Sequence, residues 1–330
     1  MIPAATPLLS VQGLKVHYAV RQGWRGKHFA VRAVDGVDLT LRAGECLGLV
    51  GESGCGKSSI AQALLGLVPA TAGVIRLDGH EITGAAQVSA MALARSAQMV
   101  FQDPMSSLNP RQTIREILSA PLRLHGMTDR TEREARVAEM LGLVGMPPEV
   151  ASRYPHEFSG GQRQRLCIAR ALILRPKLVI CDEPVSALDV SIRAQIINLL
   201  LDLKDKLGLA LLLISHDLGV VEHMSDRIAV MYLGRIVEEG GWREIFTAPS
   251  HPYTQALISA IPDPLHRDRA PARLGGEIPS PMAPPEGCAF NPRCPQALPQ
   301  CQSGQVPDFT RIGADHQARC HLLKTGTSHA

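Results

Sequence analysis

The chain has 330 residues, of which 45% are hydrophobic and 20% charged, and these proportions are ordinary for a globular protein of about two domains. The formal net charge is only +3, which indicates no general affinity for nucleic acid. No apolar run approaches the roughly 20 residues needed to span a bilayer, and no basic-then-apolar signal peptide opens the chain. We therefore expect a cytosolic protein that works at a membrane only by docking onto other subunits.

Short alternating segments open the chain. The stretches 8–16 and 33–41 alternate between apolar and polar residues, with a basic loop between them, and predict an antiparallel sheet region. The apolar run 45–50 follows and is short enough to be a buried strand. Residues 59–65 then carry apolar side chains at helical spacing, so the sequence predicts a strand, a loop and a helix in succession.

The loop between that strand and that helix fits the pattern of Gly, four residues, Gly-Lys-Ser. Glycines let backbone N–H groups turn toward phosphates, and the helix N-terminus adds partial positive charge. Lys57 is expected to reach the β- and γ-phosphates, and the Ser58 hydroxyl to ligate Mg²⁺. The predicted nucleotide-binding loop comprises Gly51, Glu52, Ser53, Gly54, Cys55, Gly56, Lys57, Ser58 and Ser59.

Residues 88–156 are mostly helical in pattern, and the amphipathic segment 131–141 is followed by the pair Pro147-Pro148. Next comes the element Ser159-Gly160-Gly161-Gln162, which precedes a further run with helical spacing. Ser159 is a plausible N-cap, and the two glycines leave bare amides at the start of this helix. This predicts a second anion site, and because the chain already has one for its own nucleotide, we expect it to serve the γ-phosphate bound to a different subunit.

Acidic residues end the next buried-strand candidate. The apolar run 178–181 delivers Asp182 and Glu183 to its C-terminal end, where ligands of open α/β sheets collect. Asp182 can bind magnesium, directly or through water. Glu183 is the better candidate to polarise the attacking water, because an unperturbed glutamate, with a pKa of about 4.3, is an ionised acceptor at neutral pH. His216 follows the apolar run 209–214 and is expected at the same sheet edge.

The order of these elements resembles the nucleotide-binding domain of an ABC transporter, whose Leu-Ser-Gly-Gly-Gln signature recurs here with Phe158 in place of leucine. The resemblance implies an α/β fold, with a P-loop NTPase (RecA-like) core, an antiparallel β subdomain and an α-helical subdomain. We place this ATPase domain at residues 8–248, with the helical subdomain at about 88–160. The groove of that subdomain is expected to receive a coupling helix from a membrane subunit.

The resemblance also assigns roles to single residues. Gln102 matches the Q-loop, which touches the metal and senses the membrane partner, and Ser186–Asp189 matches the D-loop, which crosses a dimer interface. Tyr18 is placed like the aromatic residue that stacks on adenine. The implied catalytic set is Lys57, Gln102, Glu183 and His216, with Mg²⁺ held by Ser58, Gln102 and Asp182. With one phosphate loop and one signature, the chain cannot form a two-site ATP sandwich alone.

The composition changes after about residue 248, where prolines cluster and the last four of the eight cysteines appear, namely Cys288, Cys294, Cys301 and Cys320. A cytosolic chain seldom uses a disulfide framework, so these cysteines favour a metal site. Their spacing matches neither a common zinc module nor a standard ferredoxin run, and four thiolates could hold either zinc or a [4Fe–4S] cluster.

The segments 251–257, 276–281 and 287–295 resemble the C-terminal extension of dipeptide and oligopeptide permease ATPases, here residues 249–330. This implies the F-type ATPase subunit of a peptide importer, paired with a related D-type ATPase, two membrane permease subunits and an extracytoplasmic peptide-binding protein. It also implies a peripheral position on the cytoplasmic side of the inner membrane, ATP and Mg²⁺ as cofactors, and a [4Fe–4S] cluster on the four cysteines. Import of nickel, glutathione or another small solute, a soluble ABC ATPase without a transport role, and a non-hydrolytic regulatory subunit are the alternatives.

Overall fold

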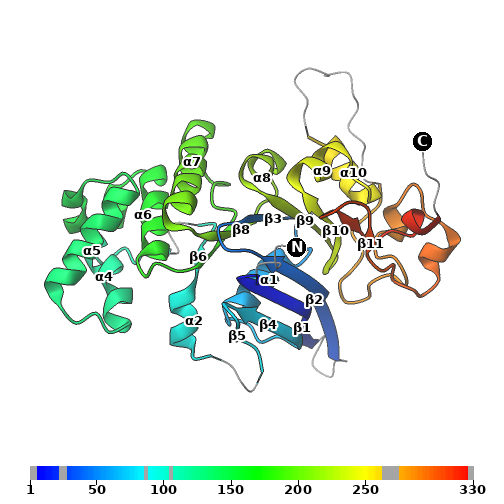
Figure 1. Cartoon of the computed structure of the whole chain (residues 1–330), viewed down its shortest axis with the longest axis horizontal. Helices are drawn as coiled ribbons and strands as arrows, with labels where there is room; N and C mark the ends of the chain where they lie inside the picture. Colours follow the sequence, from blue (N-terminus) through cyan, green and yellow to red (C-terminus); the bar gives the residue numbers. More distant parts are fainter. Residues whose placement is uncertain (1–5, 22–27, 85–87, 104–106, 262–274, 326–330) are drawn as a thin grey trace. The chain divides into compact units, whose positions relative to one another are not determined.

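The computed structural model describes residues 6–21, 28–84, 88–103, 107–261 and 275–325 (Figure 1). The chain divides into two compact units that alternate along the sequence. The first unit comprises Met1–Leu9, Leu41–Cys46 and Arg76–Ile214. The second comprises Ser10–Thr40, Leu47–Ile75 and Ser215–Ala330.

Parallel strands form the centre of the first unit. The strands β6 (Ala97–Val100), β7 (Leu178–Asp182) and β8 (Ala210–Ile214) lie in the order β8-β7-β6. Val100 lies opposite Cys181, and Asp182 lies opposite Ile214, so the three strands end at the same edge. Strand β8 is fully buried, and β7 is buried except at Asp182. Near-continuous apolar runs of this kind are typical of strands covered on both faces.

Helices make up most of the remainder of the first unit. Several of these helices have a side-chain cap at the N-terminus. Thr113 forms a capping box with Glu116, and Asp129 accepts a hydrogen bond from the backbone N–H of Thr131. The elements are β5 (His80–Glu81), α2 (Ala90–Ser96), α4 (Ile114–Leu124), α5 (Arg130–Leu143), η1 (Pro148–Ser152), η2 (Pro155–Glu157), α6 (Gly160–Leu172) and α7 (Val190–Leu207).

The second unit contains strands of two sheets. In the first, β1 (Leu9–Arg21) lies between β2 (His28–Leu41) and β4 (Ala72–Leu77). In the second, the strands run in the order β11-β12-β10-β9-β3, and only β3 and β9 pair in parallel. These strands are β3 (Cys46–Val50), β9 (Arg227–Tyr232), β10 (Arg235–Gly241), β11 (Thr310–Arg311) and β12 (Gln317–Ala318).

The C-terminal segment, residues 275–325, contributes β11 and β12 to the sheet that contains β10. Gln317 and Ala318 of β12 pair with Glu239 and Glu238 of β10. The buried Glu238 carboxylate contacts the His316 ring at 2.7 Å and accepts the backbone N–H of His251 at 2.9 Å. The helices of the unit are α1 (Lys57–Leu64), α8 (Leu218–Met224), α9 (Trp242–Thr247), α10 (Pro252–Ser259), η3 (Asn291–Arg293), η4 (Pro299–Gln302) and η5 (His321–Thr325).

Three aromatic rings form a core where β9, α10 and the C-terminal segment meet. Tyr232, Tyr253 and Phe290 are fully buried, and their ring centroids lie 4.7 to 5.4 Å apart. Aromatic pairs at this separation add about 0.5–1.5 kcal/mol to the gain from burial. The C-terminal segment is therefore anchored by packing as well as by strand pairing.

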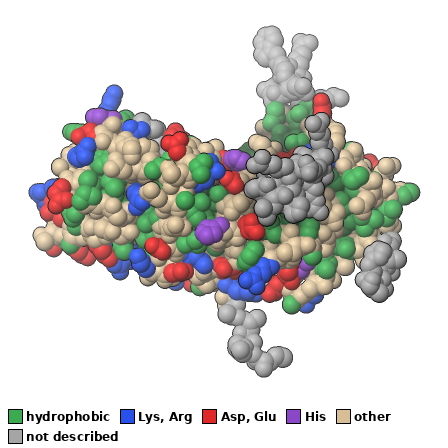
Figure 2. Space-filling view, turned by 90° about the horizontal axis from the view of Figure 1, so that it is seen from above, with side chains coloured by type: hydrophobic (Ala, Val, Ile, Leu, Met, Phe, Trp, Pro, Cys, Tyr) green, Lys and Arg blue, Asp and Glu red, His purple; other side chains and the backbone are tan. Residues whose placement is uncertain are grey.

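The surface carries charges of both signs. On the face drawn in Figure 2, basic and acidic side chains are interspersed among hydrophobic and other groups. Among the helices that the structure describes, none combines the length and the apolar character required to cross a bilayer.

Candidate nucleotide-binding and hydrolysis site

The phosphate loop lies in the second unit, between β3 and α1. Strand β3 is buried throughout, and α1 begins at Lys57 after Gly56, whose φ is 110°. A Cβ atom on Gly56 would lie 2.0 Å from the carbonyl oxygen of Ala33, and one on Gly51 would lie 2.2 Å from that of Met231. Backbone from β2 and β9 thus approaches the loop so closely that only glycine fits at these two positions.

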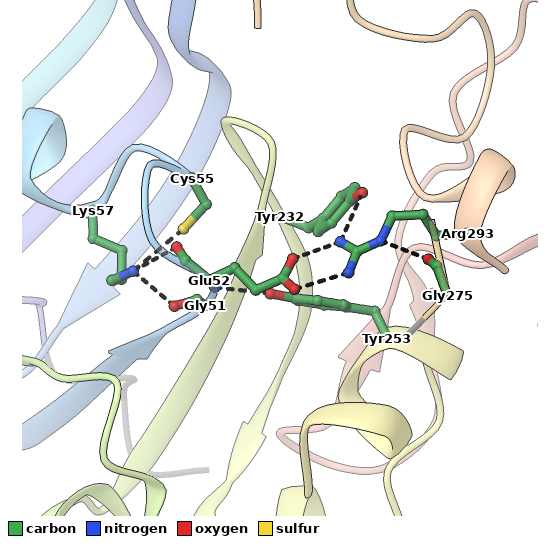
Figure 3. A network of polar contacts seen from close by, with 8 residues as sticks. All are labelled: Gly51, Glu52, Cys55, Lys57, Tyr232, Tyr253, Gly275 and Arg293. Carbon is green, nitrogen blue, oxygen red and sulfur yellow. Dashed lines mark hydrogen bonds and ion pairs between the residues drawn. The ribbon is translucent and has the colours of Figure 1, made fainter. Parts of the chain in front are cut away.

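Lys57 is buried within the loop and donates from Nζ to the carbonyl oxygens of Gly51 at 2.7 Å and Glu52 at 2.9 Å (Figure 3). The thiol of Cys55 lies 3.6 Å from the same nitrogen. Burial raises the pKa of this thiol, and the neighbouring ammonium only partly offsets that increase. Cys55 is therefore a protonated filler beside the cation, as its small size and apolar setting suggest.

The hydroxyl of Tyr18 lies beside the first turn of α1. The Tyr18 hydroxyl and the Ser59 hydroxyl are 3.3 Å apart, and the Tyr18 side chain is half-buried. Ser59 directly follows the predicted magnesium ligand Ser58. This contact puts an aromatic residue beside the nucleotide loop, and its role in stacking on adenine stays a prediction.

Three predicted site residues lie at the carboxyl ends of β6 and β7 in the first unit. Gln102 follows β6, Asp182 is the last residue of β7, and Glu183 follows it. The amide Nε2 of Gln102 donates to Glu183 Oε2 at 2.8 Å. The backbone N–H of Glu183 donates to the Ile214 carbonyl at 2.8 Å, and its φ is 48°. This left-handed conformation costs an L-residue about 1–3 kcal/mol and is typical of functional sites, where the surrounding structure enforces it. Two of the four residues predicted for catalysis, Gln102 and Glu183, are thus in contact at the carboxyl edge of the parallel strands.

The signature element begins helix α6, also in the first unit. Ser159 Oγ accepts from the Gln162 N–H at 3.4 Å, while Gln162 Oε1 accepts from the Ser159 N–H at 3.0 Å, which completes a capping box. Ser159 and Gly160 are exposed, whereas a Cβ on Gly161 would lie 2.5 Å from Ile192 Cγ2 on α7. Gly161 is needed for helix packing, and Gly160 leaves an exposed amide at a helix start.

His216 is exposed and belongs to the second unit, directly before Asp217, which caps α8 through its side chain. The predicted site residues are therefore divided between the units. The first unit holds Gln102, Asp182, Glu183 and the signature element, and the second holds Tyr18, the phosphate loop and His216.

The four C-terminal cysteines lie in the second unit. Cys301 and Cys320 are buried, Cys288 and Cys294 are half-buried, and the Cys288 N–H donates to the Cys301 carbonyl at 3.0 Å. Burial, with a smaller contribution from the charges of the other three thiols, raises the pKa of Cys288 to about 11. Over the described ranges, no three or more His, Cys, Asp or Glu side chains are grouped so that they could hold a metal ion.

Two residues that contact the phosphate loop are not identified by the sequence motifs. Tyr253 and Arg293 both contact Glu52, although they lie in the C-terminal part of the chain. Both were present in motifs that carry the family resemblance, at 251–257 and 287–295. The sequence offers one clue to Arg293, which is its place between Cys288 and Cys294 in such a motif. An arginine in a segment that packs against the protein is expected to be paired with an acidic residue, because arginine is seldom buried otherwise.

These elements define an ABC-type ATPase: a phosphate loop on a strand–loop–helix unit, an acidic pair after a parallel strand, and a capped Ser-Gly-Gly-Gln helix start. The family model described as ABC transporter matches residues 34–186, and the one described as oligopeptide/dipeptide transporter, C-terminal region, matches 237–301. The chain belongs to the ATP-binding proteins of peptide ABC transporters, because relatives with that description match it over nearly their whole length.

One such relative, the oligopeptide transport ATP-binding protein OppF of Escherichia coli, is 53% identical, over 89% of this chain and 90% of its own. The probable peptide ABC transporter ATP-binding protein y4tS of Sinorhizobium fredii is 51% identical, over 96% and 90%. The di/tripeptide transport ATP-binding protein DppF of Pseudomonas aeruginosa is 47% identical, over 95% and 97%.

The solved structures support the same fold. The ATP-binding cassette MJ0796, seen as a dimer in a post-hydrolysis state bound to ADP and Pi, has a TM-score of 0.61 and 27% identity, with 71% of this chain and 99% of that chain covered. The predicted family and the predicted ABC ATPase fold are confirmed. The predicted ATPase activity is confirmed as well, so the chain is an ABC-type ATPase.

Proposed function

We propose that this chain is the ATP-hydrolysing subunit of an importer for dipeptides and oligopeptides. The observation that carries the proposal is the match of residues 237–301 to the C-terminal region of oligopeptide and dipeptide transporters. ABC ATPases of other classes share the phosphate loop and the signature, so those elements do not specify the cargo. The C-terminal match favours transport over the alternative of a soluble ABC ATPase. The boundary between ATPase domain and extension, placed at residues 248 and 249, stays a prediction.

The site residues have separate roles in this proposal. The phosphate loop and Lys57 bind the phosphates of ATP, and Tyr18 stacks on the adenine. Mg²⁺ suits the oxygen donors of Ser58, Gln102 and Asp182, and when bound it neutralises charge on the phosphates. The amide Nε2 of Gln102 donates a hydrogen bond to Glu183 Oε2 at 2.8 Å, which leaves the Gln102 amide oxygen to serve as a ligand of Mg²⁺.

Glu183 accepts a proton from the attacking water, and Lys57 and His216 stabilise the negative charge that develops on the γ-phosphate. The partner ATPase contributes its own signature to this nucleotide, and Ser159, Gly160, Gly161 and Gln162 of this chain serve the partner's ATP. Hydrolysis removes the γ-phosphate that holds the two subunits together, and the dimer reopens. A heterodimer with a related ATPase would dock onto two permease subunits at the cytoplasmic face of the membrane. An external binding protein would deliver the cargo.

The cargo is tested in proteoliposomes that contain this chain, its partner ATPase and the two permease subunits. We expect ATP-dependent phosphate release to rise several-fold when the binding protein carries a dipeptide or an oligopeptide. The same binding protein offered nickel or glutathione is the control and should leave the rate unchanged. If nickel or glutathione, and not peptides, stimulated phosphate release, the cargo would be that small solute and the proposal of peptide import would be wrong.

We also propose that Cys288, Cys294, Cys301 and Cys320 hold a [4Fe–4S] cluster, with zinc as the alternative. The support is the chemistry of the donors, because four thiols occupy one segment of the second unit and a bound metal would offset the mutual repulsion that disfavours their thiolates. In the described residues these side chains are not grouped closely enough to hold a metal, so binding would require them to move together. Anaerobically purified protein should contain about four irons and four sulfides per chain, and Cys288→Ser should lose them. The isosteric Cys167→Ser, on α6, is the matched control. One zinc per chain, or no metal, would contradict the cluster.

A further inference from the structure

Glu52 is bound by the C-terminal part of the chain through both its backbone and its side chain (Figure 3). Its backbone N–H donates to the Tyr253 hydroxyl at 2.9 Å. Its carboxylate accepts two hydrogen bonds from Arg293, from Nη1 at 2.6 Å and from Nη2 at 2.9 Å. Its carbonyl accepts from Lys57 Nζ at 2.9 Å. One residue of the phosphate loop therefore links the nucleotide-binding lysine to two side chains from beyond residue 250.

Arg293 is held firmly enough to fix the position of Glu52. Its side chain is only 4% exposed, and Nε donates to the Gly275 carbonyl at 3.2 Å. Nη1 also lies 3.4 Å from the Tyr232 hydroxyl, and the guanidinium lies over the Tyr232 ring. The pair of the buried Arg293 with the half-buried Glu52 is bidentate and so has a fixed geometry, and loss of Glu52 would leave a buried charge without compensation.

The two side chains are fixed in turn by the aromatic core. Tyr253 on α10 packs against Tyr232 and Phe290, with ring centroids 4.7 and 5.4 Å away. Phe290 directly precedes η3, which ends at Arg293 and is followed by Cys294. The Asn291 side chain donates to the Cys288 carbonyl at 2.8 Å, so the segment between the two cysteines has a defined shape.

We propose that Arg293 and Tyr253 are positioning residues for ATP binding, because they hold Glu52 and with it the phosphate loop in one conformation. The inference rests on the proposed role of this loop in binding ATP. A loop that is ordered before the nucleotide arrives need not be ordered by it, which increases affinity. The cysteine-bearing segment thereby sets the affinity of the ATPase for its nucleotide without contacting it.

The decisive variant is Arg293→Met in the full-length chain, which keeps an unbranched apolar stem and removes the guanidinium. We expect the dissociation constant for ATP with Mg²⁺, measured by isothermal titration calorimetry, to rise about tenfold, the size expected for losing one charged hydrogen-bonded pair. In the assembled transporter the KM for ATP should rise while kcat stays within about twofold, because Gln102 and Glu183 are left in place.

Arg227→Met is the matched control. Arg227 begins β9 and forms a part-buried ion pair with Glu239 of β10, whereas Tyr232 ends the same strand. Since Arg227 pairs in register with Leu47 at the start of β3, its change lies at the strand end away from the phosphate loop. It should lower the melting temperature in the same way as Arg293→Met but leave the affinity for ATP unchanged.

Tyr253→Phe keeps the ring in the aromatic core and removes only the acceptor of the Glu52 N–H, so it tests the proposal even if Arg293→Met does not fold. We expect a three- to tenfold loss of affinity for ATP. In a Glu52→Gln background, Arg293→Met should cost less affinity than it does alone, because the pair is already weakened.

The outcomes separate this inference from the proposed function. Failure of the unaltered chain to bind ATP would overturn both. Normal binding by the unaltered chain, with unchanged affinity in folded Arg293→Met or Tyr253→Phe, would overturn the positioning role alone. Equal losses of affinity in Arg293→Met and Arg227→Met would show a general effect of stability and would also overturn it.

Discussion

Glu183→Gln is expected to lower the rate of ATP hydrolysis at least a hundredfold while ATP binding is retained. A positioned general base contributes about 10²–10⁴-fold to a rate, and glutamine cannot accept the proton of the attacking water. The amide has the shape of the carboxylate and an oxygen that can still accept the Gln102 hydrogen bond, seen at 2.8 Å in the unaltered chain. The strained backbone of residue 183, with φ of 48°, is held by its hydrogen bond to Ile214 and should not change.

Without hydrolysis, the bound ATP is expected to hold the variant and its partner ATPase together as a closed dimer. Size-exclusion chromatography with ATP and Mg²⁺ would show the dimer, and single-turnover phosphate release would give the rate. The matched change Glu149→Gln, at an exposed glutamate of η1 in the same unit, should affect neither property. Rapid multiple turnover by Glu183→Gln would remove Glu183 from the role of base.

The predictions of local structure that are confirmed depend on local patterns, while the roles of the site residues stay predictions. The buried run that ends at Val50, the glycines and the helix that starts at Lys57 are contiguous, so one stretch of sequence contains the whole phosphate loop. Ser159 and Gln162 form a capping box for the same reason, because a side chain and an amide three residues apart meet at a helix start. The location of Asp182 and Glu183 follows from the rule that ligands of open α/β sheets bind at the carboxyl ends of the strands.

The ion pair of Glu52 with Arg293 depends on no local pattern, because the two residues are 241 positions apart. The segment that carries Arg293 continues into β12, which adds to the sheet at β10, and a strand of two residues has no periodicity to detect. The left-handed backbone of Glu183 was equally hidden, since glutamate has no preference for positive φ. Long-range pairing and enforced strain are properties of the assembled unit, whereas a sequence shows directly only which residues stand at which spacing.

Gly56→Ala is expected to be among the most damaging single substitutions in the chain, although it adds only one methyl group. The Cβ would lie 2.0 Å from the Ala33 carbonyl oxygen and 2.8 Å from Met231 Cε, and the residue has φ of 110°. The oxygen belongs to backbone in β2, so it cannot rotate away as a flexible side chain would. Overpacking and backbone strain should together lower the free energy of unfolding by about 3 kcal/mol or more.

Gly54→Ala provides the control within the same loop. Gly54 also has a positive φ, of 77°, but a Cβ there would meet no atom within 4 Å. Its cost should be confined to backbone strain of about 1–2 kcal/mol. Urea denaturation of both variants, with ATP affinity measured on the folded protein, would separate the two causes. Because Gly56 caps the helix whose first residue is Lys57, its displacement should also move the lysine and weaken ATP binding more than Gly54→Ala does. Equal stability and equal affinity for ATP in the two variants would mean that the loop can move away from β2 at little cost. The close contact of Gly56 with Ala33 would then not determine the shape of the phosphate site.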